Sequence, residues 1–328
     1  MSGSATVIVV AGAQGNLGKL VCQALLARAR DLGLDVVVRG LVRRSGAAAS
    51  PAPVDVNTSR GPGQHLLPWP VDYQSREELR HACADAWCVI STLQGLEEVI
   101  VDVQSRLLEV AVEQKVRRFI PSDFSGDFTK LPDGSHRNFD LRRRFHGVAR
   151  AIIDRSASPI GLTSIFQGGF TELLGSGWVL FDYKKRRVNY FGSADAAMEF
   201  TTWQNTAEFT AATALDAGPT PRYLYPAGQR LTPRDAQALA KRVTGVDFAL
   251  TRVMPTAVLR WVIALLKVVK PGKKGDVMPM WVAMQYGYCG ALGLMSPARL
   301  DNDRYPGIHW TGVDDVVRTA FLKASGRA

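Results

Sequence analysis

Apolar runs and helical patterns alternate along the first half of the chain. The run at 6–11 (TVIVVA) has the length and the β-branched content of a buried strand. Apolar residues at 17–30 recur every three or four positions, as on one face of a helix. The same reasoning predicts strands at 6–11, 35–42, 65–71, 87–91, 117–120 and 160–166, and helices at 17–30, 75–84, 97–115 and 140–156. This alternation indicates βαβ units and a mostly parallel sheet, that is, an α/β protein.

The alternation weakens after Gln167. We expect a hairpin-like excursion at 178–190 and a mainly helical last third that is rich in Trp, Met and Tyr. Further expected elements are a helix at 206–217, a strand at 222–225 and a helix at 232–243. Clusters of glycine and proline at 45–64 predict a long surface loop.

A glycine-rich turn, Gly12-x-x-Gly15-x-x-Gly18, joins the first predicted strand to the first predicted helix. Glycine at such positions permits a tight turn, close approach of the backbone to a pyrophosphate, and close packing of the helix on the strand. The first amides of the helix and the positive end of its dipole then face the phosphates. Because the motif directly follows an apolar strand, we expect a dinucleotide site rather than a plain structural turn.

Arg43 and Arg44 stand at the end of the second predicted strand, where dinucleotide-binding proteins select their cofactor. An acidic residue there suits the ribose hydroxyl of NAD, whereas arginine accommodates the 2′-phosphate of NADP(H). No acidic residue adjoins this pair in the sequence, and a guanidinium group can bind phosphate bidentately. We therefore predict NADP(H) as the cofactor. The alternative is that both arginines are ordinary surface charges of an arginine-rich chain.

The charge balance widens the range of partners without choosing among them. The 328 residues include 40 Lys and Arg against 30 Asp and Glu, a net charge of +10. Such a charge suits nucleic acid, an anionic membrane or a phosphorylated cofactor. The basic clusters at 142–144 and 184–187 are not interleaved with stacking aromatic residues. We therefore expect a small-molecule substrate and no nucleic-acid partner.

Cysteine usage and the first residues favour a cytoplasmic protein without a metal site. The four cysteines include no C-x-x-C pair and no Cys/His cluster of zinc-site spacing. We expect buried free thiols in a reducing compartment. No basic segment precedes the first apolar run, so no secretory signal is expected.

Two apolar segments stand out in the last third of the chain. Residues 259–270 (LRWVIALLKVVK) form an amphipathic pattern, and residues 277–298 are uncharged. Pro279, Gln285 and Ser296 interrupt the second segment, so we expect no transmembrane helix. The remaining interpretations are a mobile cover over an apolar substrate, a dimer contact, or contact with a membrane surface. A monomer and a homodimer both remain open.

Several segments resemble the NmrA-like and isoflavone-reductase-like branch of the atypical short-chain dehydrogenases/reductases. They are VIVVAGAQGNLG at 7–18, LVRR at 41–44, VDYQSREELRHACADAWCVIS at 71–91, QSRLLEVAVEQKVRRFIPSDFSGDF at 104–128 and SPIGLTSIFQGGF at 158–170. The resemblance implies an α/β fold with a Rossmann-type, doubly wound, mostly parallel sheet and a smaller, interleaved, mainly helical substrate domain. The implied division is an NADP(H)-binding domain at 1–165, on which 200–230 packs back, and a substrate-binding region at 166–199 and 231–328.

The same resemblance implies which residues contact NADP(H). The expected contacts at the glycine turn and after the second strand are Gly12, Gln14, Gly15, Asn16, Leu17, Gly18, Arg43 and Arg44. Asp72 and Tyr73 are expected to flank the adenine. The inner ribose and the diphosphate are expected to meet Ser91, Thr92, Leu93 and Gln94.

The chain departs from its family at the catalytic position. It has no Tyr-x-x-x-Lys, and the reductases of this branch use a lysine thirteen residues before the proline that opens the sixth strand. Counting back from Pro159 places His146 there. Histidine performs general acid and base chemistry near neutral pH, although it reaches less far than lysine. The alternative for His146 is a helix histidine packed or solvated beside neighbouring arginines.

Five further residues are candidates: Asp123, Asp127, Lys130, Phe166 and Gln167. Asp123 replaces the usual glutamate of the family's Pro-Ser-Glu-Phe-Gly segment, and it could equally cap the end of a strand. Lys130 follows on a polar loop that could fold over the site, or it could be a solvated lysine. Phe166 and Gln167 end the sixth strand, where they could line a substrate pocket, and Phe166 could instead belong to the core.

Two functions remain open on this basis. The first is an NADPH-dependent reductase that transfers hydride to a small apolar, aromatic or quinone-like substrate, with His146, Asp123 or Lys130 supplying a proton or orienting an oxygen. The second is a non-catalytic NADP(H)-binding sensor or regulator. The departures at the Tyr-x-x-x-Lys motif and at His146 favour the second.

Overall fold

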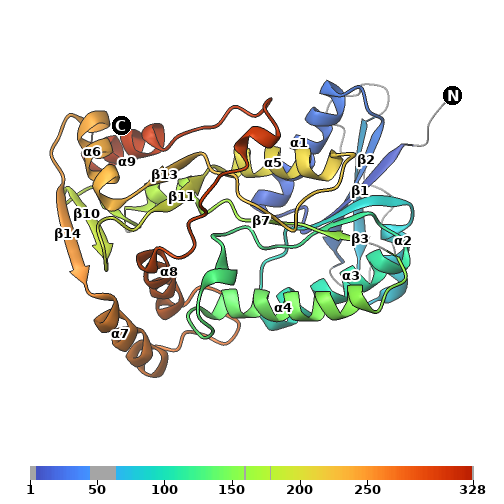
Figure 1. Cartoon of the computed structure of the whole chain (residues 1–328), viewed down its shortest axis with the longest axis horizontal. Helices are drawn as coiled ribbons and strands as arrows, with labels where there is room; N and C mark the ends of the chain where they lie inside the picture. Colours follow the sequence, from blue (N-terminus) through green and yellow to red (C-terminus); the bar gives the residue numbers. More distant parts are fainter. Residues whose placement is uncertain (1–4, 45–63, 159, 178, 327–328) are drawn as a thin grey trace. The chain divides into compact units, whose positions relative to one another are not determined.

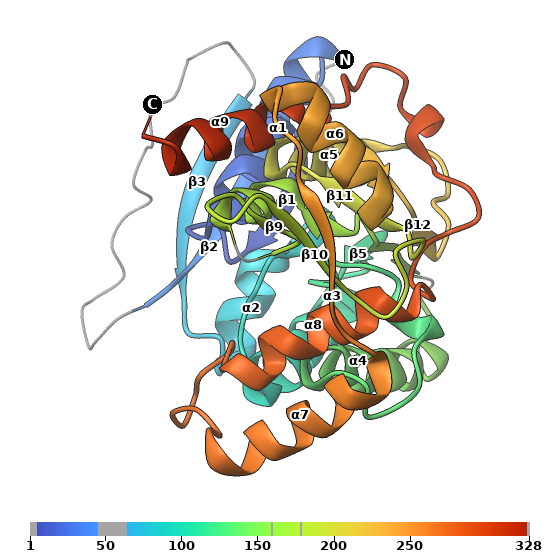
Figure 2. The same cartoon turned by 90° about the vertical axis from the view of Figure 1, so that its left-hand side faces the viewer.

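The computed structural model describes residues 5–44, 64–158, 160–177 and 179–326 (Figures 1 and 2). The surface loop expected at 45–64 lies outside these ranges apart from Gln64. The described chain divides into two compact units. Unit 1 consists of Met1–Asp123, Leu141–Ile165 and Thr206–Leu224, and unit 2 of Phe124–Asp140, Phe166–Asn205 and Tyr225–Ala328.

Unit 1 is built on a six-stranded parallel sheet of order β3-β2-β1-β4-β5-β6. Its strands are β1 (Thr6–Ala11), β2 (Val36–Arg43), β3 (Gln64–Val71), β4 (Ala86–Ser91), β5 (Arg118–Ile120) and β6 (Gly161–Leu162). The strand order reverses beside β1, which pairs with β2 on one side and β4 on the other. This is the order of a Rossmann-type doubly wound fold, so the expected fold class is confirmed.

Helices cover both faces of this sheet (Figure 1). They are α1 (Asn16–Asp31), α2 (Arg76–Cys83), α3 (Gln104–Glu113), α4 (Arg137–Asp154), of which the part from Leu141 belongs to unit 1, and α5 (Trp203–Leu215), of which the part from Thr206 does. Because both faces are covered, Ile8, Val9 and Val10 of the central strand β1 are fully buried. All four cysteines are buried free thiols, as the sequence predicts, and burial raises the pKa of Cys83 to about 12.

Two elements of unit 1 differ from the sequence-based expectation. The helix expected at 97–115 begins as a π-helical segment at Glu98–Val103 and becomes the α-helix α3 only at Gln104. The single strand expected at 160–166 is divided, because its two parts pair with different neighbours. Its first part is β6, which pairs with β5, and its second part is β7 (Ser164–Ile165), which pairs with β12 (Tyr223–Leu224).

Unit 2 contains two small sheets and most of the late helices. One sheet joins the antiparallel pair β9 (Phe181–Asp182) and β10 (Arg187–Phe191) to β14 (Ala249–Met254), and the other joins β8 (Gly169–Phe170), β11 (Met198–Thr201) and β13 (Gln229–Leu231). The helices are α6 (Pro233–Thr244), α7 (Thr256–Val269), α8 (Met280–Leu292) and α9 (Asp314–Ala324). The hairpin and the mainly helical last third match expectation, whereas β14 was not expected.

The residue ranges of the units do not coincide with the expected boundaries. The segment Phe124–Asp140, expected inside 1–165, belongs to unit 2. The segment Thr206–Leu224, within the range 200–230 that was expected to pack back, belongs to unit 1. The chain therefore passes between the units several times.

Candidate functional site

The glycine turn at the carboxyl end of β1 accepts no side chain at two of its positions. Gly12 has a φ of +81°, and a Cβ there would lie 2.9 Å from Oγ1 of Thr92. A Cβ at Gly18 would collide with the carbonyl oxygen of Gly12. Glycine at these positions therefore lets α1 begin directly against the end of β1.

The amino terminus of α1 is open to an anion. Its N-cap is Gly15, which has no side chain to cap the helix, and the first turn contains no acidic residue. Gln14, Gly15 and Asn16 are exposed, whereas Leu17 is half-buried and Gly18 is buried. Amides at such a helix end bind phosphate, so this cradle fits the pyrophosphate of a dinucleotide.

The end of β4 forms the other side of the cradle. The hydroxyl of Thr92 donates to the carbonyl oxygens of Ala11 (2.9 Å) and Gly12 (3.2 Å), so it ties the turn to β4. Ser91 and Leu93 are buried, whereas Gln94 is exposed. The carbonyl oxygen of Leu93 accepts a hydrogen bond from the hydroxyl of Ser122.

Tyr73 lies beneath the glycine turn. Its hydroxyl accepts a hydrogen bond from the amide of Gly12 at 3.2 Å and lies 3.4 Å from the carbonyl oxygen of Leu41. The side chain is buried, and burial raises the pKa of Tyr73 to about 12. Tyr73 thus stabilises the glycine turn by accepting the hydrogen bond from Gly12. Asp72 is exposed and accepts a hydrogen bond from the amide of Gln74.

The two arginines at the end of β2 have different surroundings. Arg43 is exposed, whereas Nη2 of Arg44 lies 2.9 Å from Oε2 of Glu78 on α2. The same carboxylate oxygen accepts the amide of Asp72 at 2.7 Å. The sequence shows no acidic residue beside the arginine pair, but the fold brings one from 34 positions away. Arg43 is therefore the arginine more available to a phosphate.

His146 and Asp123 meet within unit 1. Nε2 of His146, on α4, lies 2.7 Å from Oδ2 of Asp123, which follows β5. The side chain of Asp123 is fully buried, and that of His146 is 12% exposed. The hydroxyl of Ser164, on β7, donates to the same Oδ2 at 2.7 Å. Two candidates that the sequence places 23 positions apart thus form one hydrogen-bonded pair.

Asp123 remains ionised in this arrangement. Burial alone raises the pKa of its carboxyl. The positive charge of His146, the hydrogen bonds from His146 and Ser164, and the charge of Arg142 together outweigh that effect and hold the pKa below its ordinary value. Because the carboxylate can only accept, Nε2 of His146 carries the hydrogen of the pair.

Three residues around this pair were not found from the sequence. Nη1 of Arg222 donates to the hydroxyl of Ser164 at 2.8 Å. The ring of Tyr223 is nearly parallel to that of His146, with centroids 6.5 Å apart. Gln104, where the π-helical segment becomes α3, accepts the amide of Ser122 at 2.9 Å. Tyr223 lies on β12 and Arg222 directly precedes it, and no local pattern shows that β12 pairs with β7. The contact of Gln104 with Ser122 is likewise a long-range contact.

The remaining candidates belong to unit 2. Nζ of Lys130 lies 3.4 Å from Oδ2 of the buried Asp127, and this oxygen also accepts the hydroxyl of Tyr225 at 2.9 Å. Phe166 is buried against Phe128, edge to face, with ring centroids 5.1 Å apart. Phe166 thus has the surroundings of a core residue, which was the alternative to a role in lining the substrate pocket.

Gln167 is fully buried beside Phe166 in the sequence. Its side-chain Nε2 donates to the carbonyl oxygen of Gly168. The backbone carbonyl oxygen of Gln167 accepts a hydrogen bond from the hydroxyl of Thr201 at 2.6 Å. No partner of its Oε1 lies among the described residues.

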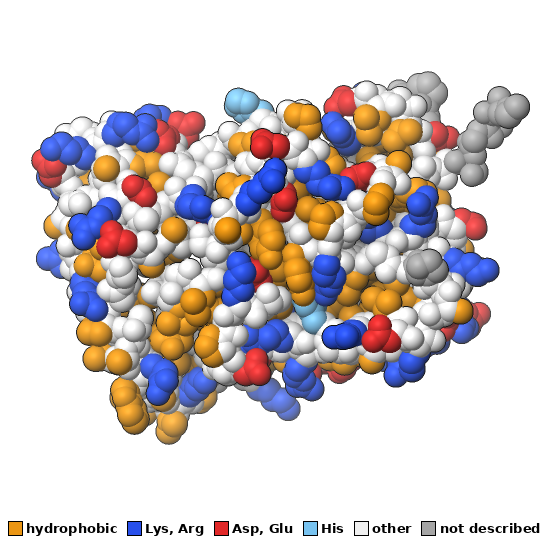
Figure 3. Space-filling view, in the orientation of Figure 1, with side chains coloured by type: hydrophobic (Ala, Val, Ile, Leu, Met, Phe, Trp, Pro, Cys, Tyr) orange, Lys and Arg blue, Asp and Glu red, His pale blue; other side chains and the backbone are white. Residues whose placement is uncertain are grey.

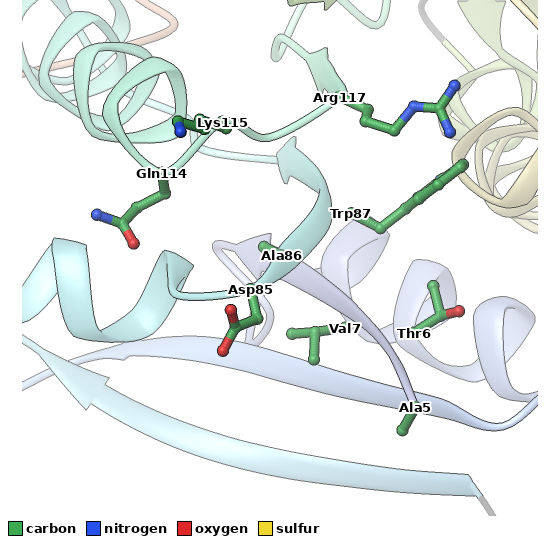
Figure 4. A pocket seen from close by; sticks show the side chains of 9 residues that line it. All are labelled: Ala5, Thr6, Val7, Asp85, Ala86, Trp87, Gln114, Lys115 and Arg117. Carbon is green, nitrogen blue, oxygen red and sulfur yellow. The ribbon is translucent and has the colours of Figure 1, made fainter. Parts of the chain in front are cut away.

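A pocket of about 290 Å³ lies at the opposite, amino-terminal edge of the unit 1 sheet (Figure 4). The guanidinium group of Arg117 lies 4.3 Å from the ring centre of Trp87 there. The lining residues are Ala5, Thr6, Val7, Asp85, Ala86, Trp87, Gln114, Lys115 and Arg117. Cofactors of open α/β sheets bind at the carboxyl ends of the strands, so this pocket is not the cofactor site.

Comparisons with known proteins agree with the fold. The NmrA-like family model matches residues 4–271. Two similar solved structures are AtPrR2 with NADP+ and (+)pinoresinol (18% identity, 97% of this chain and 99% of that chain, TM-score 0.69) and an isoflavone reductase (16%, 96% and 99%, 0.70). A third is the leucoanthocyanidin reductase–NADPH complex from Vitis vinifera (15%, 96% and 99%, 0.65). A search of curated proteins finds no match.

Proposed function

Because the chain belongs to the NmrA-like family, we propose that it is an NADP(H)-dependent reductase of a small apolar, aromatic or quinone-like substrate. The observation that supports this most is the cradle formed by Gly12, Gly18 and the uncapped end of α1. Two of the similar structures are described as complexes with NADP+ or NADPH. When bound, the nicotinamide supplies the hydride, and the protein supplies position and electrostatics.

In this proposal the cradle holds the cofactor by its phosphates. The amides of Asn16 and Leu17 bind the pyrophosphate at the positive end of α1. Arg43 binds the 2′-phosphate, because Arg44 is already engaged by Glu78. Thr92 keeps the turn in place, and Gln94 is exposed at the same edge.

His146 is the proposed proton donor to the substrate oxygen. Asp123 accepts the hydrogen of Nε2, which fixes the orientation of the ring. Ser164 and Arg222 hold the carboxylate in turn. In this proposal His146, paired with Asp123, acts at the position that the resemblance gives to a lysine.

The cofactor claim is tested by the dissociation constants of NADPH and NADH. Arg43→Gln is expected to weaken NADPH binding by roughly 10-fold and to leave NADH binding unchanged, because only NADPH carries the 2′-phosphate. Arg30→Gln, at an exposed arginine near the end of α1, is the matched control. Tighter binding of NADH than of NADPH by the unmodified protein would contradict the claim.

The proton-transfer claim is tested by turnover of NADPH with a panel of quinones and phenylpropanoids. His146→Ala is expected to lower kcat by roughly 100-fold or more while the affinity for NADPH stays the same. Unchanged turnover in this variant would remove His146 from the mechanism. If no substrate is reduced and the protein distinguishes NADP+ from NADPH in affinity, the sensor function is favoured instead.

A further inference from the structure

Helix α7 has two apolar sides, and only one of them is covered within unit 2. Leu259 and Ile263 are buried where α7 packs on α8. Trp261, Leu265 and Val268 are 75%, 61% and 79% exposed. A helix that is apolar on both sides requires a second apolar environment for the side that its own fold leaves in water.

The exposed apolar residues form one continuous stripe. They recur at spacings of three and four along α7, which places them on the same face of the helix. The stripe, called here the α7 face, consists of Val258, Trp261, Leu265, Val268 and Val269. The exposed Met278 and Met280 follow between α7 and α8.

The charged residues on α7 and on the segments next to it in the chain are positive. The six charged residues between Asp247 and Asp276 are all basic, and all of them are exposed: Arg252, Arg260, Lys267, Lys270, Lys273 and Lys274. Figure 3 shows hydrophobic side chains beside Lys and Arg side chains at the lower left, where Figure 1 places α7. The helix thus combines an exposed apolar stripe with basic residues on the helix itself and on the segment that follows it, up to Asp276.

The positive charge of these residues distinguishes between a second copy of the chain and a lipid surface as the occupant of the α7 face. In a twofold dimer the same surface faces itself, so the basic residues of α7 and of the segment after it would approach those of the other copy. An anionic lipid surface is complementary in both respects. Basic side chains lie at the phosphate level, and the apolar face enters the boundary with the acyl chains. Tryptophan favours this interfacial zone, because its ring is apolar and its N–H is polar.

We propose that α7 is a membrane-docking helix, which lies flat on an anionic bilayer with Trp261, Leu265 and Val268 inserted. No helix within the described ranges is long and apolar enough to cross a membrane. Docking therefore uses the interface and not a span. The proposal does not depend on the reductase function, because it uses no residue of the cradle or of the His146–Asp123 pair.

Sedimentation of the full chain with lipid vesicles tests the proposal. The protein is expected to sediment with vesicles of phosphatidylserine mixed with phosphatidylcholine, and not with vesicles of phosphatidylcholine alone. The triple variant Lys270→Gln, Lys273→Gln, Lys274→Gln is expected to bind the mixed vesicles roughly 100-fold more weakly. The double variant Trp261→Ser, Leu265→Gln is expected to lose roughly 10-fold or more. All these side chains are exposed, so the fold is retained.

Matched controls carry the same kinds of change elsewhere. They are Lys184→Gln, Lys185→Gln, Arg187→Gln for charge, and Leu34→Gln, Leu173→Gln for exposed apolar residues. Both controls are expected to bind vesicles like the unmodified protein. Equal losses in the controls and in the α7 variants would overturn the proposal. So would a dimer that Trp261→Ser, Leu265→Gln converts to a monomer, since the α7 face would then cover a second copy.

Discussion

At the scale of single residues, the His146–Asp123 pair links stability to pH. The pKa of Asp123 is held below its ordinary value in the folded protein. The carboxyl of Asp123 therefore binds a proton more readily in the unfolded chain than in the folded protein. The contribution of the ionised carboxylate to stability is present above a pH of about 4 and is lost as the pH falls below it.

Asp123→Asn is expected to remove this contribution. Urea unfolding at neutral pH should show a loss of about 3 kcal/mol in the free energy of unfolding, because His146 and Ser164 lose a charged partner. The difference between variant and unmodified protein should shrink as the pH is lowered through about 4. A difference that stays constant down to strongly acidic pH would show that the ionised carboxylate is not its source.

Glu78 is expected to oppose the arginines in the proposed binding of the 2′-phosphate, because its carboxylate pairs with Arg44. Glu78→Gln is expected to release Arg44 from its ion pair and to tighten NADPH binding by about fivefold, while NADH binding changes little. Glutamine can still accept the amide of Asp72, so the turn before α2 is kept. The dissociation constants of both nucleotides measure the effect. Looser binding of NADPH in this variant would mean that Arg44 does not reach the phosphate.

Sequence reasoning located the glycine turn but not the contacts across the sheet. Gly12, Gly15 and Gly18 are close in the sequence, and their spacing already carries their geometry. The contacts of Arg44 with Glu78 and of His146 with Asp123 depend on where α2 and α4 come to rest on the sheet. A local pattern contains no information on such long-range contacts. The pattern therefore named the candidates without naming their partners.

At the scale of elements, a single arginine joins β5 to the end of α5. The buried guanidinium group of Arg118 donates to the carbonyl oxygens of Thr213, Ala214, Asp216 and Gly218. It thereby satisfies carbonyl groups that a helix end leaves without partners. The sequence showed only a basic residue at the start of a short strand.

Arg118→Met is expected to destabilise the protein by about 3 kcal/mol, because several buried carbonyl groups lose a charged donor. The neighbouring variant Arg117→Met is the control, with an expected loss of about 1 kcal/mol or less. Arg117 is exposed and its main contact is with the ring of Trp87. Urea unfolding measures both. Equal losses in the two variants would contradict the capping role of Arg118.

Two elements that sequence reasoning missed depend on features that a local apolar pattern does not contain. The π-helical segment Glu98–Val103 has the same apolar periodicity as an ordinary first helical turn, so periodicity cannot separate the two. The division between β6 and β7 follows from a change of pairing partner, from β5 to β12. The partner strand lies about sixty positions later in the chain, which a window of ten or twenty residues does not include.

At the scale of the whole molecule, cofactor binding should stabilise unit 1 selectively. NADPH at 100 times its dissociation constant is expected to add about 2.7 kcal/mol to the stability of the folded unit that binds it. Calorimetry should show one transition moving upward with NADPH, and the core of unit 2 around Phe181 and Phe321 should keep its own transition. NADH at the same concentration is the control and should shift the transition less. A shift of equal size with both nucleotides would contradict the role of Arg43.

The discontinuous composition of unit 1 has a consequence for its synthesis. Its three stretches end at Asp123, Ile165 and Leu224, and the last one supplies β12 and the carbonyl groups that Arg118 needs. When only the first 165 residues of a nascent chain have emerged from the ribosome, β7 and Arg118 do not yet have their partners from the stretch Thr206–Leu224. The nascent unit can therefore close only after Leu224 has left the exit tunnel, by which time the first two segments of unit 2, Phe124–Asp140 and Phe166–Asn205, have already emerged completely.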